Sequence, residues 1–157
     1  MELRIVQAGL KWPRERIHTR PASDIRYIVV HHTDSGPRAG AEQLHRQHLA
    51  RGWAGLGYHY LVYEDGVVVK ARQDLWVPAC VAGFNRQSLC VALVGSFRNV
   101  PPSDQHLQAA ATLLRALKSA YPGAEVVRHR DLNPTECPGA AFPWRHFLAL
   151  VGPQVVA

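Results

Sequence analysis

The amino-acid sequence predicts an α/β domain with a central mixed β-sheet of about five strands, flanked by about three helices. Two observations lead to this fold class. Short apolar runs typical of buried strands alternate with longer stretches whose apolar residues follow helical spacing. The 157 residues, 47% hydrophobic and 19% charged, also suffice for one core, and no repeat or linker divides them. We therefore expect one domain over residues 1–157, with its motifs between about 25 and 150.

The first half of the chain contains the signals for three strands and one helix. Residues 27–30 form a continuous apolar run that ends at two histidines, which is typical of a strand buried on both faces. Helical spacing over residues 41–51 predicts a helix. Residues 56–63 and 67–72 are expected to pair as a hairpin around the Asp65-Gly66 turn.

The second half contains two further strands and two helices. An apolar run predicts a strand over residues 88–95. Ser103 is a good N-cap for a long amphipathic helix that Pro122 would end. A short strand is expected over residues 125–128 and a terminal helix over residues 143–151. Strands interleaved with helices in this way indicate a central sheet covered by helices.

Composition limits the classes of partner. A formal net charge of +6 and a pI near 9.7 favour anionic polymers such as nucleic acids, acidic lipid headgroups and bacterial wall polymers. No arginine-rich or aromatic–basic segment is present, so no nucleic acid is expected as partner. The sequence contains no stretch of 18 consecutive apolar residues, so we expect no insertion into a membrane. Because residues 1–10 lack the pattern of a signal peptide, we expect synthesis in the cytoplasm without one.

The three cysteines are odd in number and widely spaced, which argues against a disulfide framework. Cys80 and Cys90 could pair. The reducing conditions of the cytosol nevertheless favour buried thiols at both positions.

Two histidines and one cysteine have the chemistry of a catalytic metal site. His31 lies at the carboxyl end of a predicted buried strand, where α/β sheets place their sites. His129 directly follows another predicted strand, and Cys137 lies in the Thr-Glu-Cys-Pro-Gly loop beyond it. Two imidazoles and one thiolate favour zinc and leave a position open for water or substrate. The spacing by itself is weak evidence, because a histidine that caps a loop and a cysteine that fills an apolar gap are common.

Six other histidines are interpreted as surface or packing residues: His18, His32, His45, His48, His106 and His146.

Four segments of the chain form an ordered set of motifs. They are Tyr-Ile-Val-Val-His-His-Thr (27–33), Gly-Tyr-His-Tyr (57–60) followed by Glu-Asp-Gly (64–66), Asn-Arg-Gln-Ser-Leu-Cys-Val-Ala-Leu-Val-Gly (85–95) and His-Arg-Asp-Leu-Asn-Pro-Thr-Glu-Cys-Pro-Gly (129–139). Together they resemble the type 2 N-acetylmuramoyl-L-alanine amidases, a family that includes small phage amidases and the peptidoglycan recognition proteins.

The resemblance implies one Zn²⁺ per chain, bound by His31, His129 and Cys137. It also implies that Tyr58 points at the scissile carbonyl or at the attacking water. Thr135, two residues before the cysteine, is the second residue expected to stabilise the developing charge or to move a proton. The site would then suit acyl transfer from an amide to water.

The substrate groove is expected to include Asn85, Cys80 and His59, with Cys80 standing where much of the family has a groove-lining histidine. Strand alternation would put Tyr58 and Tyr60 on one face and His59 on the other. Ala92 occupies the position of a glutamate in the cytosolic muropeptide-recycling branch. This difference favours the phage and recognition-protein branch and leaves the general base open.

The implied activity is cleavage of the amide between N-acetylmuramic acid and L-alanine in peptidoglycan, by a phage or prophage endolysin. Such an enzyme is made in the cytoplasm, acts on the cell wall after release by a phage lysis system, and binds peptidoglycan or muropeptides as a monomer. Three alternatives remain: a peptidoglycan-binding module without catalysis, a regulatory role through protein contacts, and hydrolysis of another amide.

Overall fold

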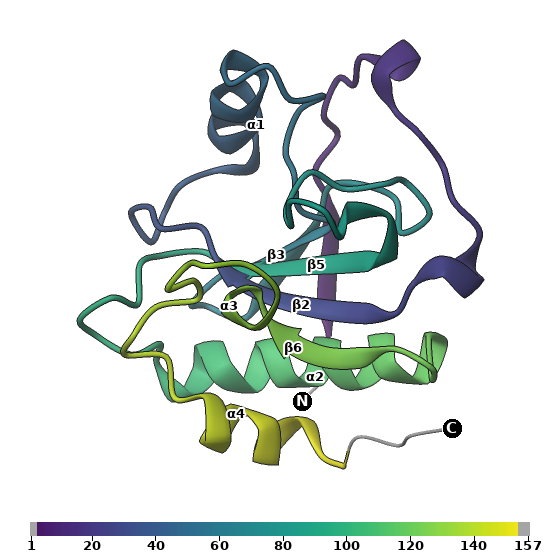
Figure 1. Ribbon diagram of the computed structural model, residues 1–157. Coiled ribbons are helices and arrows are strands. Elements are labelled where there is room, and N and C mark those ends of the chain that lie inside the picture. The colour runs from purple at the N-terminus through teal and green to yellow at the C-terminus, as the bar shows by residue number, and fades with distance from the viewer. Residues whose placement is uncertain (1–2, 154–157) are drawn as a thin grey trace.

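The computed structural model describes residues 3–153 of the chain. Over this range six strands form one sheet in the order β1-β4-β3-β5-β2-β6 (Figure 1). Strands β3 and β4 pair antiparallel and the other neighbours pair parallel, so the sheet is mixed as predicted. The strands are β1 (Arg4–Gln7), β2 (Tyr27–His32), β3 (Tyr60–Val62), β4 (Val67–Lys70), β5 (Ser88–Leu93) and β6 (Glu125–Arg128).

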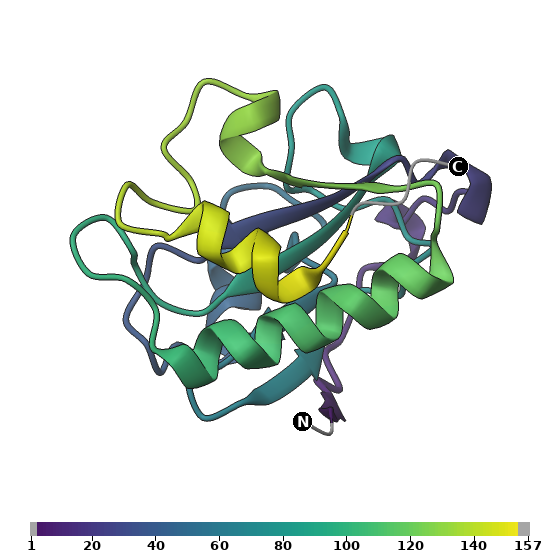
Figure 2. The same cartoon turned by 90° about the horizontal axis from the view of Figure 1, so that it is seen from below.

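Helices cover the two faces of the sheet unequally. Helices α2 (Asp104–Ala120) and α4 (Trp144–Val151) pack side by side under one face (Figure 2), whereas α1 (Ala41–Ala50) lies over the opposite face (Figure 1). The short helix α3 (His129–Leu132) follows β6 directly. The predicted N-cap is confirmed, because Ser103 accepts a hydrogen bond from the backbone N–H of His106 at 3.2 Å. Among the described residues no helix is long and apolar enough to cross a membrane.

The α/β class is confirmed, but the sheet has one strand more than the expected five and the described residues hold one α-helix more than the expected three. Strand β1 was not predicted because its four residues are all exposed at the sheet edge and show no buried face. Helix α3 was not predicted because its four residues are too few for helical periodicity to appear.

Alternation along β2 and β5 separates a packing face from a functional face. Val30 and Val91 point into the main core, where α2 and α4 pack. Val29 and Cys90 lie on the opposite face in a separate cluster. His31, two residues after Val29, shares that opposite face. The hydrophobic pattern of one strand thus places an imidazole on the side of the sheet away from the helical layer.

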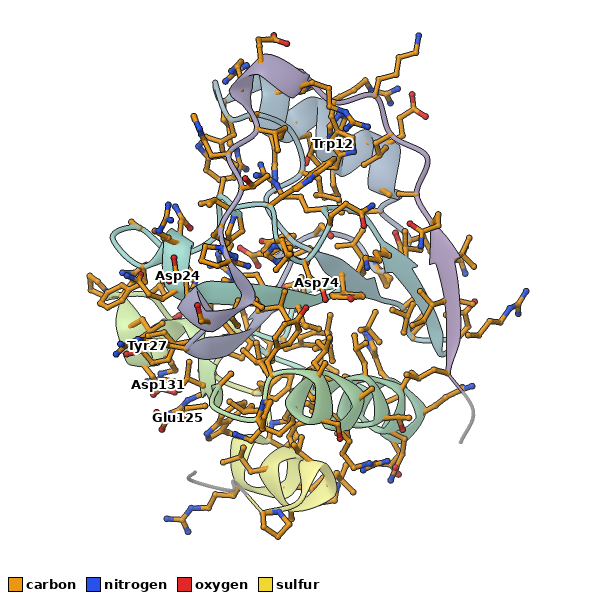
Figure 3. All side chains as sticks on the ribbon, turned by 90° about the vertical axis from the view of Figure 1, so that its right-hand side faces the viewer. Trp12, Asp24, Tyr27, Asp74, Glu125 and Asp131 are labelled. Atoms are coloured by element: carbon orange, nitrogen blue, oxygen red, sulfur yellow. A yellow bond between two sulfur atoms is a disulfide. The ribbon has the colours of Figure 1, made fainter. Side chains whose placement is uncertain are left out.

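The region above the sheet is held by an aromatic cluster that joins the N-terminal segment to α1. Trp12 is labelled in Figure 3. Its ring lies 4.8 Å from the ring of His45 and 5.4 Å from that of Trp76, both edge to face. The guanidinium of Arg72 lies over the Trp12 ring at 5.4 Å. These contacts fix α1 over the sheet, so the residues that follow it have defined positions.

One predicted strand is shorter than expected, and this reverses a predicted side-chain orientation. The chain bends at His59, and β3 begins only at Tyr60. Tyr60 packs into the core beneath the sheet and donates a hydrogen bond to Asp74, which Tyr121 of the α2 C-terminus also contacts, each at 2.7 Å. Tyr58 instead packs on the functional face. The prediction that Tyr58 and Tyr60 share a face is therefore wrong, because regular strand alternation does not extend through the bend.

Four buried histidines act as acceptors for backbone N–H groups. Each uses Nδ1, at 2.9–3.1 Å from the donor nitrogen, and the pairs are His32 with Phe97, His45 with Leu56, His48 with Gly57, and His59 with Cys90. An imidazole that accepts at Nδ1 is neutral, with its proton on Nε2. The packing role predicted for His32, His45 and His48 agrees with these contacts.

As the pH is lowered, the fold should therefore lose stability already at pH values above those at which the carboxylates become protonated. Burial lowers the pKa of His48 to about 4 and that of His59 to about 3, below the ordinary value of 6.5. Below about pH 6.5 the unfolded chain binds protons that the folded chain does not, so the free energy of unfolding falls as pH decreases. Each such histidine adds about 1.4 kcal/mol per pH unit to the slope.

Equilibrium urea unfolding between pH 6 and pH 4.5 measures this slope. His48→Asn retains a side-chain acceptor near the position of Nδ1 but does not titrate. We expect its slope to be smaller than that of the wild type by about 1.4 kcal/mol per pH unit. Equal slopes in the two proteins would show that His48 is not held neutral by the fold.

Candidate metal centre

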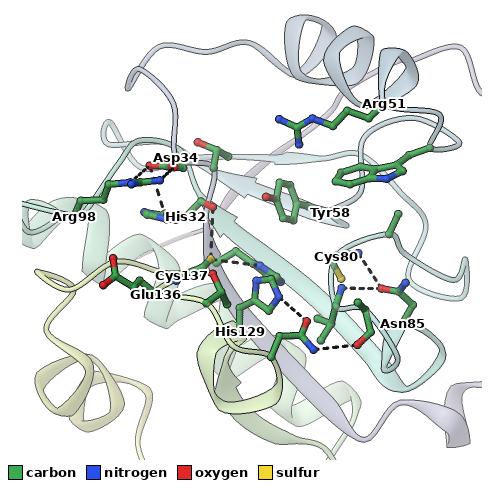
Figure 4. A pocket seen from close by; sticks show the side chains of 18 residues that line it. His32, Asp34, Arg51, Tyr58, Cys80, Asn85, Arg98, His129, Glu136 and Cys137 are labelled. Atoms are coloured by element: carbon green, nitrogen blue, oxygen red, sulfur yellow. Dashed lines mark hydrogen bonds and ion pairs between the residues drawn. The ribbon is translucent and has the colours of Figure 1, made fainter.

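The three predicted metal ligands come together at the carboxyl end of β2, and Figure 4 shows two of them, His129 and Cys137. One ligand atom from each of His31, His129 and Cys137 lies within 4.8 Å of the other two. The Sγ of Cys137 is 3.7 Å from Nδ1 of His31, and the two imidazole ring centres are 4.7 Å apart. Residues separated by about a hundred positions thus form one cluster, because β2 and β6 are adjacent parallel strands that end at the same edge.

This donor set fits zinc. Two ligands at zinc–sulfur and zinc–nitrogen bond lengths with a tetrahedral angle between them are about 3.6 Å apart. The distance of 3.7 Å between the Cys137 sulfur and the His31 nitrogen agrees with that value. The Nε2 of His129 lies 2.9 Å from Oδ1 of Asn133, which directs Nδ1 of His129 to the cluster as a free lone pair. A ligand held by a neighbouring side-chain acceptor is typical of zinc sites.

Burial keeps all three ligands neutral before a cation binds. It lowers the pKa of His31 well below its ordinary value, with the nearby His129 as a further cause, and it lowers the pKa of His129 as well. Burial also raises the pKa of the Cys137 thiol to about 12. The thiol contacts the carbonyl oxygen of His32 at 3.8 Å. Two neutral imidazoles and a thiol that a cation can deprotonate make a suitable site for a divalent metal.

Tyr58 and Thr135 both line the cavity that contains the cluster. The Tyr58 ring lies 5.1 Å from the His31 ring and points into the cavity (Figure 4). Burial raises the pKa of Tyr58, so its hydroxyl remains a proton donor at neutral pH. Within residues 3–153 this hydroxyl has no hydrogen-bonding partner of its own. Thr135 is exposed, and its Oγ1 accepts from the backbone N–H of Cys137 at 3.3 Å, so its hydroxyl hydrogen remains available.

The backbone before Tyr58 is fixed by a close approach and by the helix above it. A Cβ at Gly57 would lie 2.1 Å from the carbonyl oxygen of Ala79, so only glycine fits there. The N–H of Gly57 donates to His48 and that of Leu56 to His45, both residues of α1. These contacts hold the Tyr58 backbone between α1 and the cavity wall.

The cavity has a volume of about 710 Å³ and carries charged groups that the sequence motifs did not predict. Arg51 and Trp53 line it beyond Tyr58, with the guanidinium over the indole at 5.3 Å. Asp34 and Arg98 form a two-point ion pair at the opposite side, and this pairing lowers the pKa of Asp34 to about 2. No spacing rule connects these residues with His31, although the exposed Arg-Gly-Trp sequence after α1 was a usable signal.

Of the three predicted groove residues, Asn85 and Cys80 line the cavity. Asn85 uses its Oδ1 to accept from the backbone N–H groups of Cys80 and Val81 at 2.9 and 2.8 Å, so it also shapes the wall. His59 is fully buried outside the cavity, bonded to Cys90 and to the carbonyl of Trp76. This position contradicts the prediction that His59 contacts substrate.

Cys80 and Cys90 form a disulfide, which corrects the expectation of two buried thiols. The bond joins the cavity wall to β5, and Cys137 remains the free cysteine. Spacing along the chain gave no reason to expect the pair. The two cysteines meet because the segment around Ala79 folds back over β5, where Gly57 leaves room for it.

Comparison with known proteins gives the family of this chain. Residues 21–140 match the family described as N-acetylmuramoyl-L-alanine amidase, and this range contains the whole cluster. The chain belongs to this family. The endolysin of Enterobacteria phage T3 is 28% identical over 130 residues, which cover 78% of this chain and 86% of the phage protein. The Ph2119 endolysin from a Thermus scotoductus MAT2119 bacteriophage is 35% identical with a TM-score of 0.83, covering 96% of this chain and 100% of that one.

The amidase family also includes proteins named for recognition. A peptidoglycan-recognition protein of Drosophila melanogaster is 29% identical over 125 residues, which cover 73% of this chain and 69% of the insect protein. The family prediction made from four ordered motifs is thus confirmed. The chain is similar both to endolysins and to a recognition protein, so its activity has to be inferred from the chemistry of its own site.

Proposed function

We propose that this member of the amidase family hydrolyses the amide between N-acetylmuramic acid and L-alanine in peptidoglycan, in a zinc-dependent reaction, as a phage-type endolysin acting on the cell wall. The observation that carries the proposal is the cluster of His31, His129 and Cys137 in the wall of an open cavity that Tyr58 also lines. A site used only for binding has no need of a thiol, two neutral imidazoles and a hydroxyl donor at one point.

The residues divide the chemistry as follows. When bound, zinc supplies a Lewis acid that polarises the amide carbonyl and acidifies water. Tyr58 donates its hydroxyl hydrogen to the oxygen on which charge develops, since burial keeps that hydroxyl protonated. Thr135, which lines the same cavity, would donate a second hydrogen bond to that oxygen. Asn133 keeps the His129 ring in the orientation that a ligand needs.

The cavity around the cluster suits a peptide that carries carboxylates. Arg51 is a cation on the cavity wall, backed by the ring of Trp53 at 5.3 Å. Arg98, by contrast, is already paired with Asp34. We therefore propose that Arg51 binds a carboxylate of the stem peptide, as planar guanidinium groups do.

Arg51→Ala should raise KM for muropeptides about tenfold and change kcat little, because the lost hydrogen bond contributes equally to substrate and transition-state binding. Arg46→Ala is the matched control, since Arg46 is an exposed arginine of α1 that contacts Glu42. Steady-state kinetics on a soluble muropeptide measure both constants. If Arg51→Ala behaves like the Arg46 control, Arg51 does not bind substrate.

The competing function is peptidoglycan binding without catalysis, which the recognition-protein relatives keep open. Digestion of purified peptidoglycan distinguishes the two. We expect new L-alanine amino termini to appear, with no new reducing sugar ends, because the muramoyl amide is the bond cut. Binding to peptidoglycan without new amino termini would favour the binding module, and new amino termini of another residue would indicate a different amide.

A further inference from the structure

A second group of metal-binding atoms surrounds His31. A ring nitrogen of His31 and the sulfurs of Cys80 and Cys90 all lie within 4.8 Å of one another. Cys90 is fully buried on β5, where it pairs with Val29 of the neighbouring strand β2. Cys80 is half-buried and lines the cavity. His31 is thus shared by two groups of soft ligand atoms, and in one of them the two sulfurs are joined in a disulfide.

The His31 ring provides a second, independent observation. Its Nδ1 is directed to Cys137, whereas its Nε2 is buried and has no hydrogen-bonding partner among the described residues. Buried imidazoles elsewhere in the protein have partners, as the ring nitrogens of His59 and His45 do. The sulfurs of a disulfide are weak acceptors, so the disulfide does not supply the missing partner. Two thiolates would be stronger acceptors and also good ligands for a soft cation.

We propose that the Cys80–Cys90 disulfide is a redox switch of the metal centre. In the reduced protein, Cys80, Cys90 and His31 form a second site for a thiophilic divalent cation such as zinc, and this site competes with that of His31, His129 and Cys137. The competition follows from the shared histidine, because a neutral imidazole has one nitrogen lone pair to give. The effect on hydrolysis rests on the proposed function, whereas the second metal site does not.

The switch requires a small dithiol as reductant. Its thiolate attacks Sγ of Cys80, the sulfur that lines the cavity, and the sulfur–sulfur bond breaks with Cys90 leaving as a thiolate. The second thiol of the reductant then attacks the reductant sulfur that is bonded to Cys80. This attack breaks the mixed disulfide and releases Cys80 as a thiolate. Two electrons pass to the protein, and the reductant leaves as a cyclic disulfide. Its two thiol protons are available to the two cysteines until a cation displaces them.

A Cys137→Ser variant tests the second site in isolation, because the remaining thiols come from the disulfide alone. The variant is prepared oxidised, and also reduced with a dithiol that is removed anaerobically, and both forms are titrated with Co²⁺. We expect no sulfur-to-cobalt absorption in the oxidised form and a band that saturates at one equivalent in the reduced form. Adding Cys80→Ser to this background should weaken cobalt binding at least about tenfold.

Two results would overturn the proposal. One is a reduced variant with two new titratable thiols but no sulfur-to-cobalt band, and the other is a folded protein whose disulfide does not open under the dithiol. In the wild type, reduction should roughly double the intensity of the sulfur-to-cobalt band, since two thiolate ligands replace one. The rate of peptidoglycan hydrolysis should decrease as the fraction of reduced protein increases. A protein that shows the cobalt result but never hydrolyses peptidoglycan would contradict the proposed function and leave the metal switch standing.

Discussion

Replacing Cys137 with serine is expected to abolish hydrolysis and to lower zinc affinity at least about a hundredfold. Loss of an outer partner of a metal ligand already costs about ten- to a hundredfold in affinity, and a ligand itself should cost more. A serine hydroxyl has the shape of the thiol but stays protonated at neutral pH, so it does not supply the anionic ligand. The variant should show no release of alanine termini above background.

The fold should tolerate this substitution. Cys137 is only half-buried and lies in a loop outside the core clusters. Circular dichroism and the thermal midpoint of the metal-free proteins serve as the control, and both should match the wild type closely. A folded Cys137→Ser protein that keeps near-wild-type turnover would show that the thiol is not a metal ligand.

Replacing Tyr58 with phenylalanine is expected to lower kcat by about a hundred- to a thousandfold while zinc stays bound. This is the magnitude found when one donor to a developing oxyanion is removed. The ring packing against His31 at 5.1 Å is retained in phenylalanine, so the substitution removes the hydroxyl alone. Parallel zinc analysis and steady-state kinetics on the same preparation measure both quantities.

Tyr63→Phe is the matched control for the hydroxyl. The Tyr63 hydroxyl donates to the carbonyl of Ala39 at 2.7 Å and does not line the cavity. Its loss should cost about 1 kcal/mol of stability and leave kcat unchanged. Equal kcat values for Tyr58→Phe and the wild type would remove Tyr58 from the mechanism.

The sequence predicted the parts of the site that depend on strand ends and motif order. The apolar run before His31 identified a buried strand, and the parallel sheet then brings the end of that strand beside His129. Cys137 and Tyr58 were predicted through resemblance, because no periodicity connects them with the histidines. Both line the same cavity as His31 in the structure.

The parts that the sequence did not predict depend on distances between segments. The Cys80–Cys90 disulfide requires the cavity wall to approach β5, which Gly57 permits. His59 was predicted to line the groove because it lies next to Tyr58 in a motif. The chain bends at His59, and its side chain points into the interior, where it accepts a hydrogen bond from the backbone N–H of Cys90. Arg51 lines the cavity from the end of α1, whose position depends on contacts with the distant Trp12, Leu56 and Gly57.

The most direct test is a zinc titration of the metal-free, oxidised wild-type protein, with the rate of release of L-alanine amino termini from peptidoglycan as the measured quantity. The rate should be at background without metal, rise linearly with bound zinc, and level off at one equivalent per chain. A full rate in the metal-free protein would contradict the role of zinc. Binding of one zinc with no release of alanine termini would contradict the proposal that this chain is a hydrolase.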